Sequence, residues 1–221
     1  MRSISDRQRD LYQDSLKKHG DSSQATHQND RVTQHLRFER LLRGLSPHLE
    51  GSSVHDVGCG FGELGRYMAD HGAAGNYSGI EIVEGMAELG RKRLGVEIVV
   101  DDFMTRDYDT QYDFVVASGV FNIPGGTAAA EWNVYCRAMI KKMYSIARKG
   151  IAFNGLTTHT DYRRDDLHYW DPEEALSVCR SDLSRFCVLD QAYPLYEWTI
   201  TAYRPELVRK AYSQDALDKY F

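Results

Sequence analysis

The distribution of apolar residues along the chain predicts an alternation of strands and helices. From Gly51 to Tyr203, short apolar runs typical of strands alternate with longer segments whose apolar residues recur every three or four positions. The segment 132–148 has one apolar helical face: Tyr135, Ala138, Met139, Met143, Ile146 and Ala147. The predicted strands are Ser53–Val57, Asn76–Glu81, Glu97–Val100, Tyr112–Ser118, Gly150–Asn154, Arg185–Leu189 and Glu197–Tyr203. The predicted helices are Glu63–His71, Glu84–Leu94, Trp132–Arg148 and Pro172–Arg180.

This alternation predicts an α/β fold with a doubly wound, Rossmann-like and mostly parallel sheet of seven strands, covered by helices on both faces. The last two predicted strands depart from the alternation, because only Asp190–Tyr196 separates them. Such a connection is too short for a crossover helix. The C-terminal strand is therefore expected to run antiparallel to its neighbours.

The chain divides into three parts by its pattern: residues 1–50, 51–203 and 204–221. In the first part, the pattern predicts a short helix ending near His19, a polar loop at 21–30 and a second helix from Val32 to Leu45. A helical cap on the sheet and a lid over a ligand are both compatible with this pattern. The middle part forms the core, and the last part is a tail with one short helix and no assignable chemistry.

A glycine-rich turn is the strongest local signal. Gly58, Gly60 and Gly62 alternate directly after a predicted strand that carries Asp56, and a predicted helix follows. Glycines adopt positive φ and have no Cβ, and the start of a helix presents unpaired N–H groups. This arrangement predicts a nucleotide-like ligand. Because Gly60–Gly65 also fits the dinucleotide pattern G-x-G-x-x-G, the turn alone leaves the ligand open.

Glu81, at the end of the second predicted strand, is a further candidate ligand residue. A carboxylate there can accept hydrogen bonds from both hydroxyls of a ribose, as in NAD-binding sheets. The alternative interpretation is a solvent-exposed acid at a strand end. Its position after the glycine turn favours the nucleoside.

Composition and charge narrow the class of partner. The chain has 221 residues, a net charge of −5 and 42% hydrophobic residues, and its pI is about 5.9. An acidic chain gives no general attraction to nucleic acid or to anionic lipid. No apolar run approaches the roughly 20 residues of a membrane span, and the N-terminus lacks the apolar stretch of a signal peptide. The four cysteines show no C-x-x-C spacing, so we expect a reducing, cytoplasmic location and no zinc site.

The string Asp56-Val57-Gly58-Cys59-Gly60-Phe61-Gly62 resembles the first motif of the class I S-adenosylmethionine-dependent methyltransferases. The predicted antiparallel terminal strand resembles the last strand of the sheet in this family, which runs antiparallel to the others. Segments 34–38, 112–122, 149–154 and 193–200 look like a bacterial subgroup known as largely uncharacterised small-molecule or surface-sugar methyltransferases. The resemblance covers roughly residues 10–203. It departs at His55, where an apolar residue is usual, and at Gln28, where the subgroup often has Trp.

The resemblance implies S-adenosyl-L-methionine as the cofactor and assigns its contacts. Glu81 would hold the ribose, Asp102 with Phe103 the adenine, and Asp101 competes with Asp102 for that role. The implied cofactor-binding residues are Arg37, Asp56, Gly58, Cys59, Gly60, Gly62, Glu81, Ile82, Met86, Asp101, Asp102, Phe103, Ser118, Gly119 and Val120.

The polar and aromatic segment after the fifth predicted strand is the expected entrance for the methyl acceptor. His159 is the first candidate for a general base and His168 the second, although a base is needed only for a nucleophile that starts protonated. The candidate acceptor-binding residues are Asn122, Tyr162, Arg163, Tyr169, Trp170 and Tyr196. An ordinary surface loop would have a similar composition. His55, inside a predicted strand, is expected to be a hydrogen-bonded core residue rather than a catalyst.

The function predicted from these features is methyl transfer to a small-molecule or sugar-type acceptor by in-line displacement. We expect no nucleic acid partner, no membrane insertion and no metal, and the sequence leaves the oligomeric state open. One alternative is an NAD-linked oxidoreductase, although neither Tyr108 nor Tyr135 is followed by a Lys four positions later. The other alternative is a non-catalytic protein that binds S-adenosylmethionine.

Overall fold

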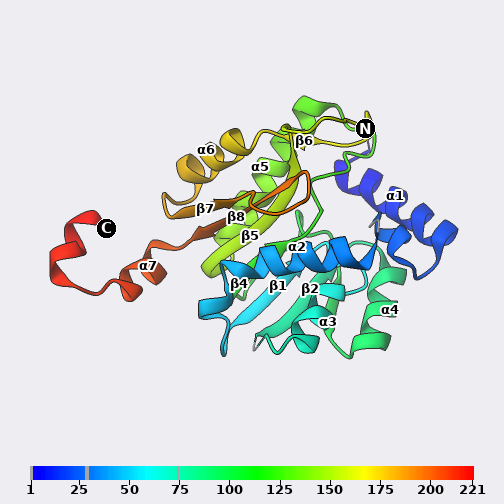
Figure 1. Ribbon diagram of the computed structural model, residues 1–221. Helices are drawn as coiled ribbons and strands as arrows, with labels where there is room; N and C mark the ends of the chain where they lie inside the picture. The colour runs from blue at the N-terminus through cyan, green and yellow to red at the C-terminus, as the bar shows by residue number, and fades with distance from the viewer. Residues whose placement is uncertain (1, 28–29, 74) are drawn as a thin grey trace.

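The computed structural model describes residues 2–27, 30–73 and 75–221 (Figure 1). The departure expected at Gln28 lies outside the described residues. The strands are β1 Ser53–Val57, β2 Asn76–Glu81, β3 Glu97–Val100, β4 Tyr112–Ala117, β5 Ala147–Thr157, β6 Tyr169–Trp170, β7 Cys187–Asp190 and β8 Glu197–Tyr203. They form one sheet in the order β3-β2-β1-β4-β5-β8-β7, and the short β6 pairs with β5 beside this path.

The pairing confirms the predicted fold. β1 to β5 run parallel to one another, whereas β8 is antiparallel to both of its neighbours, β5 and β7. The predicted hairpin therefore closes one edge of a Rossmann-like sheet. The parallel strands bring their carboxyl ends to the same edge, which is where ligands bind in sheets of this kind.

The helices lie on both faces of the sheet (Figure 1). Their bounds are α1 Ile4–His19, η1 Ser23–Thr26, α2 Arg31–Arg43, η2 Ser46–His48, α3 Glu63–Asp70, α4 Glu84–Leu94, α5 Ala129–Ser145, α6 Pro172–Asp182, α7 Pro205–Ala211 and η3 Asp215–Tyr220. Successive residues of a strand point to opposite faces. Phe114 and Val116 consequently pack with α2 and α3, whereas Val115 packs with α5 and α6.

Several elements differ from those that the sequence predicted, for example α5, which spans Ala129–Ser145 rather than Trp132–Arg148. β5 extends from Ala147 to Thr157, well beyond the expected 150–154, because β8 pairs along most of its length. β7 begins at Cys187 rather than Arg185. β6 was not predicted at all, since a strand of two residues exists only through its pairing with the distant Leu156 and Thr157.

The N-terminal part contains two helices of different character. α2 lies along the sheet, while α1 lies beside α4 and the cavity described below (Figure 1). α1 begins with a capping box between Ser3 and Asp6, and its buried residues are Ser5, Gln8 and Ser15. At the other end of the chain, α7 and η3 project beyond the sheet (Figure 1), and the last residue, Phe221, packs against Phe186 with 5.5 Å between ring centroids. The division at residues 50 and 203 stays a prediction.

None of the helices in the described part of the chain combines the length and the apolar composition that a membrane span requires.

Candidate functional site

A cavity of about 140 Å³ lies between the carboxyl ends of the strands and the N-terminal helices. It is lined by Gln8, Tyr12, Thr26, Gln34, Phe38, Asp56, Val57, Gly58, Cys59, Gly60, Phe61, Glu63, Leu64, Ile80, Glu81, Ile82, Met86, Asp101, Asp102, Phe103, Ser118, Gly119, Val120, Tyr135 and Met139. All of the predicted cofactor-binding residues except Arg37 and Gly62 are in this lining. The structure therefore brings residues from the ends of β1, β2, β3 and β4 to one place.

The glycine turn forms one wall of the cavity. Gly58 and Gly60 have φ of +67° and +55°, a region that side chains other than glycine rarely adopt. The Gly58 N–H donates to the carbonyl of Ile80 at 2.9 Å, which ties the turn to β2. A Cβ on Gly60 would lie 3.0 Å from the methyl of Thr26, so the gap between the glycine turn and η1, which carries Thr26, is narrow.

Gly62 has a different role. A Cβ there would lie 3.2 Å from Leu94 and 3.3 Å from Ile98, side chains of the α4–β3 region. Gly62 also has positive φ, at +75°, and stands at the start of α3. It is a packing position in this structure, whereas Gly58 and Gly60 face the cavity.

Glu81 is a buried carboxylate with two backbone donors. Its side chain is 6% exposed, and its oxygens accept from the N–H of Gly60 at 2.8 Å and of Val83 at 2.9 Å. Burial raises the pKa of Glu81, and these hydrogen bonds oppose the shift. The alternative of a solvent-exposed acid at a strand end is wrong. Glu81 both fixes the glycine turn and lines the cavity.

Asp56 lies beneath the turn and is also buried. The hydroxyl of Tyr77 donates to its Oδ2 at 2.9 Å. Burial raises the pKa of Asp56 to about 7, and this hydrogen bond opposes the shift. The cavity floor therefore holds a carboxyl group that titrates close to neutral pH.

Two acidic residues follow β3, and their carboxylates have different partners. Asp101 forms an ion pair with Arg106 at 2.8 Å, whereas Oδ1 of Asp102 accepts from the N–H of Met104 at 2.8 Å. The next residue, Phe103, is buried in the main core cluster and also lines the cavity. Because both acids line the cavity, the choice between them for the adenine stays open.

His55 is a hydrogen-bonded core residue, as predicted. Its Nδ1 lies 3.0 Å from Oγ of Ser78, and its ring stacks on Tyr112 with 4.0 Å between centroids. Burial, reinforced by the charge of Arg106, lowers the pKa of His55 to about 4.

Arg37 lies on α2, outside the cavity lining, and forms an ion pair with Glu197 of β8. Its Nε lies 2.7 Å from Oε1 of Glu197, and both side chains are largely buried. This pair connects α2 to the antiparallel strand. A cofactor contact of Arg37 stays a prediction.

The structure does not bring His168 to the cavity lining. Its Nδ1 lies 3.1 Å from the carbonyl of Phe121, and its Nε2 lies 2.7 Å from the amide of Asn133. Burial lowers the pKa of His168. With both ring nitrogens engaged, His168 connects the segment before β6 to α5 and has no free nitrogen for an acceptor.

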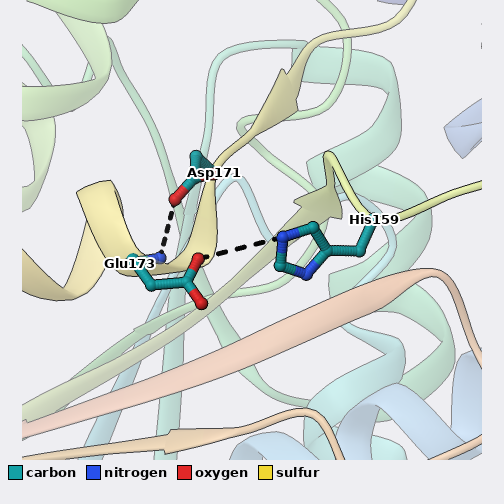
Figure 2. Close-up of side chains that lie close together, drawn as sticks. All are labelled: His159, Asp171 and Glu173. Carbon is teal, nitrogen blue, oxygen red and sulfur yellow. Dashed lines mark hydrogen bonds and ion pairs between the residues drawn. The ribbon is translucent and has the colours of Figure 1, made fainter.

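His159 lies at the surface beyond the end of β5, with its side chain 58% exposed. Its Nε2 is 4.0 Å from Glu173, and both lie close to Asp171 (Figure 2). These three side chains are the group in the described chain whose ligand atoms are close enough together for a metal ion. Asp171, however, accepts from the N–H groups of Glu173 and Glu174 as the cap of α6. Acids at a helix start complement its positive end, which itself disfavours a cation.

The predicted acceptor residues are also outside the cavity lining. Tyr162 is 72% exposed, and Tyr196 is half-exposed with its hydroxyl 3.3 Å from Asp161. Arg163 donates to the carbonyl of Thr158 at 2.7 Å and lies over the ring of Tyr169. Trp170 is buried in the main core cluster. The segment 158–170 is thus held by contacts between its own residues, by Tyr196 and, at its end, by the packing of Trp170 in the core.

Asn122 lies in the turn after β4. Its carbonyl accepts from the N–H of His168 at 2.8 Å, while its side-chain Oδ1 is buried without a partner in the described structure.

The sequence did not assign to the site the residues of the cavity lining that come from the N-terminal helices, or Tyr135 of α5. The N-terminal residues are Gln8, Tyr12, Thr26, Gln34 and Phe38. The signals available were the resemblance of segment 34–38, the apolar helical face that includes Tyr135 and the short helix predicted to end near His19. None of them indicated that these side chains face the cavity. Gln8 reaches across the cavity edge, because its Nε2 donates to the carbonyl of Ile123 at 3.0 Å.

Comparison with known proteins shows the family of the chain. Residues 54–150 match the family described as "Methyltransferase domain". The chain is 34% identical over 161 residues to Rv1506c of Mycobacterium tuberculosis, a protein named as a methyltransferase; the match covers 72% of this chain and 93% of that protein.

Solved structures share the fold at low identity. The magnesium protoporphyrin IX methyltransferase of Synechocystis PCC 6803 with bound SAH superimposes with a TM-score of 0.66 at 17% identity, covering 91% of this chain and 100% of that one. The N-methyltransferase NodS of Bradyrhizobium japonicum, also with SAH, gives a TM-score of 0.63 at 16% identity, covering 88% and 98%.

A Rossmann-like sheet with an antiparallel C-terminal strand and a glycine turn beside a buried acid defines a nucleoside-cofactor enzyme. The chain belongs to the class I S-adenosylmethionine-dependent methyltransferases, and S-adenosyl-L-methionine is its cofactor.

Proposed function

We propose that this methyltransferase transfers the methyl group to a small-molecule acceptor, including acceptors of sugar type, by in-line displacement within the cavity. The observation that carries the proposal is the acidity of the cavity. Its wall includes the carboxyl groups of Asp56, Glu63, Glu81, Asp101 and Asp102. Among the described residues of the wall there is no Lys, Arg or His.

This charge pattern favours a cationic cofactor. S-adenosylmethionine carries a sulfonium and an ammonium group, so nearby carboxylates attract it, and little solvent screens them inside the protein. The pyrophosphate of NAD is doubly negative and would meet the same carboxylates unfavourably. The cavity thus supports the sulfonium cofactor over the nicotinamide alternative.

The cover of the cavity supports a small acceptor. α1 and η1 contribute Gln8, Tyr12 and Thr26 to the wall, so a bulky polymer would have to displace them. The name of the Synechocystis neighbour also describes a small-molecule acceptor. The sugar type rests on the resemblance of segments 149–154 and 193–200 to the surface-sugar subgroup.

The residues present fit the cofactor. Gly58 and Gly60 line the cavity with bare backbone, and a Cβ there would meet Val120 at 2.9 Å or Thr26 at 3.0 Å, while Glu81 can hold the ribose hydroxyls. The bound cofactor supplies an activated methyl group on a sulfonium. The protein's contribution is then chiefly positioning, which can account for several kcal/mol of the barrier.

Calorimetric titration with S-adenosylmethionine, SAH and NAD tests the cofactor part of this proposal. We expect micromolar-range affinity for the first two and none for NAD. Gly60→Val should remove binding, because its Cβ branch enters the narrow gap at Thr26. Gly72→Val is the matched control: Gly72 also has positive φ, at +64°, but has open space around it and lies outside the cavity wall.

Release of SAH in the presence of small acceptors tests the enzymatic part. Cofactor binding without turnover of any acceptor would favour a non-catalytic binding protein. NAD binding without any response to SAH would contradict the proposal as a whole.

A further inference from the structure

The strand order indicates which end of the cavity receives the amino-acid part of the cofactor. The strands follow one another as β3-β2-β1-β4 along the edge that forms the cavity. In the proposed placement the adenine lies after β3 and the ribose at Glu81 of β2, so the methionine part extends over the glycine turn after β1 toward the start of α3. Gln34 and Phe38 of α2 line this end, because Phe38 packs in the same cluster as Leu64 of α3.

The amino-acid part of S-adenosylmethionine carries both an ammonium and a carboxylate. The acids of the wall attract the ammonium, and Glu63 at the start of α3 is the wall acid that precedes Leu64. The carboxylate needs hydrogen-bond donors instead, because a carboxylate that leaves water without them bears a large desolvation cost. The described wall contains no Lys, Arg or His that would supply such donors.

The backbone of the glycine turn has few donors to spare. Its N–H groups that already donate to acceptors of the protein, at 2.8 to 3.2 Å, are those of Gly58, Cys59, Gly60 and Gly62. The first N–H groups of α3 are the backbone donors left at this end. Side chains of the wall must supply the rest.

The phenols of the wall lie near acids. Burial raises the pKa of Tyr12 and of Tyr135, and the nearby charges of Glu81 and Asp102, respectively, add to these shifts. A carboxylate at either phenol would therefore meet a like charge. These two hydroxyl groups suit the ribose and adenine end of the cavity better than the amino-acid end.

Gln34 carries the donor that remains. The hydroxyl of Thr26 donates to a backbone carbonyl at 3.0 Å, and that of Ser118 is buried. The wall has two amide side chains, and Nε2 of Gln8 donates to the carbonyl of Ile123 at 3.0 Å. Gln34 is half-buried, and its amide makes no hydrogen bond with the described residues. Its Nε2 thus offers two N–H donors to a ligand.

We infer that the amide of Gln34 holds the carboxylate of the cofactor, so that a neutral side chain rather than an arginine recognises this group. The inference rests on the proposed placement of the cofactor and specifies its amino-acid end. Arg37, three residues further along α2, is outside the wall and pairs with Glu197, with 2.7 Å between Nε and Oε1. A neutral donor also leaves the acids of the wall free to attract the sulfonium, which an arginine in the cavity would repel.

The decisive comparison uses SAH and decarboxylated SAH, which differ in this group alone. Gln34→Met keeps the length of the side chain and removes its amide. In calorimetric titration this variant should bind SAH at least about tenfold more weakly, whereas its affinity for decarboxylated SAH should change by less than about threefold. Gln34→Glu replaces the N–H donors by a carboxylate oxygen, so it should weaken SAH at least as much and spare decarboxylated SAH.

Gln13→Met is the matched control, because Gln13 is exposed on α1 and outside the wall. Both of its affinities should stay within about twofold of the wild type. Equal losses for the two ligands in Gln34→Met would mean that Gln34 shapes the wall without contacting the carboxylate. Unchanged affinity for SAH would mean that it makes no contact. Either result would overturn the inference.

A crystal structure of the wild-type protein with SAH decides the matter even if the variants do not fold. Nε2 of Gln34 within hydrogen-bond distance of the carboxylate supports the inference, whereas a carboxylate bonded to Arg37, or to no side chain of α2, refutes it. Failure of the wild type to bind SAH at all would refute the proposed function instead, so the two failures are distinguishable.

Discussion

The two N-terminal helices differ in the residues that they bury fully. α2 buries Phe38, Leu41 and Leu42 against the sheet. α1 fully buries only polar residues, Ser5, Gln8 and Ser15, while its Tyr12 and Leu16 are partly buried against a small apolar cluster. α2 is therefore part of the core, whereas α1 is a cover over the cavity.

The difference has a thermodynamic consequence. Detaching α2 would expose large apolar side chains, at roughly 25 cal/mol for each Å². Detaching α1 would expose only partly buried apolar side chains, those of Ile4, Tyr12 and Leu16. It would also exchange protein hydrogen bonds for bonds to water, and the net cost of each such exchange is only about 1 kcal/mol. We expect α1 to open for cofactor entry while α2 stays in place.

The largest expected effect is on stability and concerns α2. Leu41 is 0% exposed within the cluster that α2 shares with the sheet. Leu41→Ala should lower the free energy of unfolding by about 2–5 kcal/mol, because it leaves a cavity in a packed core. Urea unfolding measures this. A loss below about 1 kcal/mol would mean that α2 is no more integral to the core than α1.

The next effect tests the cavity floor beneath α1. The pKa of Asp56 rises from 3.8 to about 7 on folding, so the folded state binds the extra proton in that range. The stabilisation is present below about pH 4 and is lost as the pH rises to about 7. Relative to Asp56→Asn, the free energy of unfolding of the wild type should fall across this window, by an amount on the order of a few kcal/mol.

His55 gives this experiment its control. Its pKa is lowered to about 4, so its contribution has the opposite sign and is lost as the pH falls. The slope difference between wild type and Asp56→Asn should therefore persist in a His55→Leu background. Parallel pH profiles for wild type and Asp56→Asn would contradict the shifted carboxyl.

A smaller effect, on ligand affinity, concerns α1. Tyr12 lines the cavity, and burial, reinforced by the charge of the nearby Glu81, raises the pKa of its phenol. Tyr12→Ala should weaken SAH binding by about tenfold, or roughly 1.4 kcal/mol, because it opens the wall next to the ribose site. Tyr212→Ala, on the exposed tail, is the calorimetric control and should leave affinity unchanged.

The smallest effect compares the two helices directly. Gln8→Ala removes the bond to Ile123 and should change the free energy of unfolding by less than about 1 kcal/mol. Native-state hydrogen exchange should show α1 amides opening at lower free energy than those of α2. Saturating SAH should slow exchange in α1. Equal protection of both helices without ligand would show that α1 does not open separately.

The part of the cavity wall around the glycine turn was predictable because it is built locally. A strand, a glycine turn and a helix start are consecutive in the sequence, so Asp56, Gly58 and Gly60 must lie together wherever the sheet forms. Glu81 follows at the end of the neighbouring parallel strand, and adjacent carboxyl ends meet at one edge. The antiparallel end of the sheet was equally predictable from the short link between β7 and β8.

The features that depend on pairings between distant segments were not predictable. Segment 158–170 has the composition of a binding loop, but the structure places it outside the cavity lining, so an acceptor contact there stays a prediction. Asn154 looks like an ordinary strand residue in the sequence. Only the register of β4 against β5 brings it to Gly119, and its amide nitrogen has no partner among the described residues.

The sequence by itself thus determined the order of elements, the family resemblance and the residues of the glycine turn, since each depends on neighbours in the chain or on a repeated local pattern. Tertiary structure decided that Glu81 is buried, that Gln8 and Tyr12 of α1 line the cavity, and which buried polar atoms have no partner among the described residues. Burial and hydrogen-bond satisfaction are properties of the packed molecule, because each depends on atoms contributed by other elements.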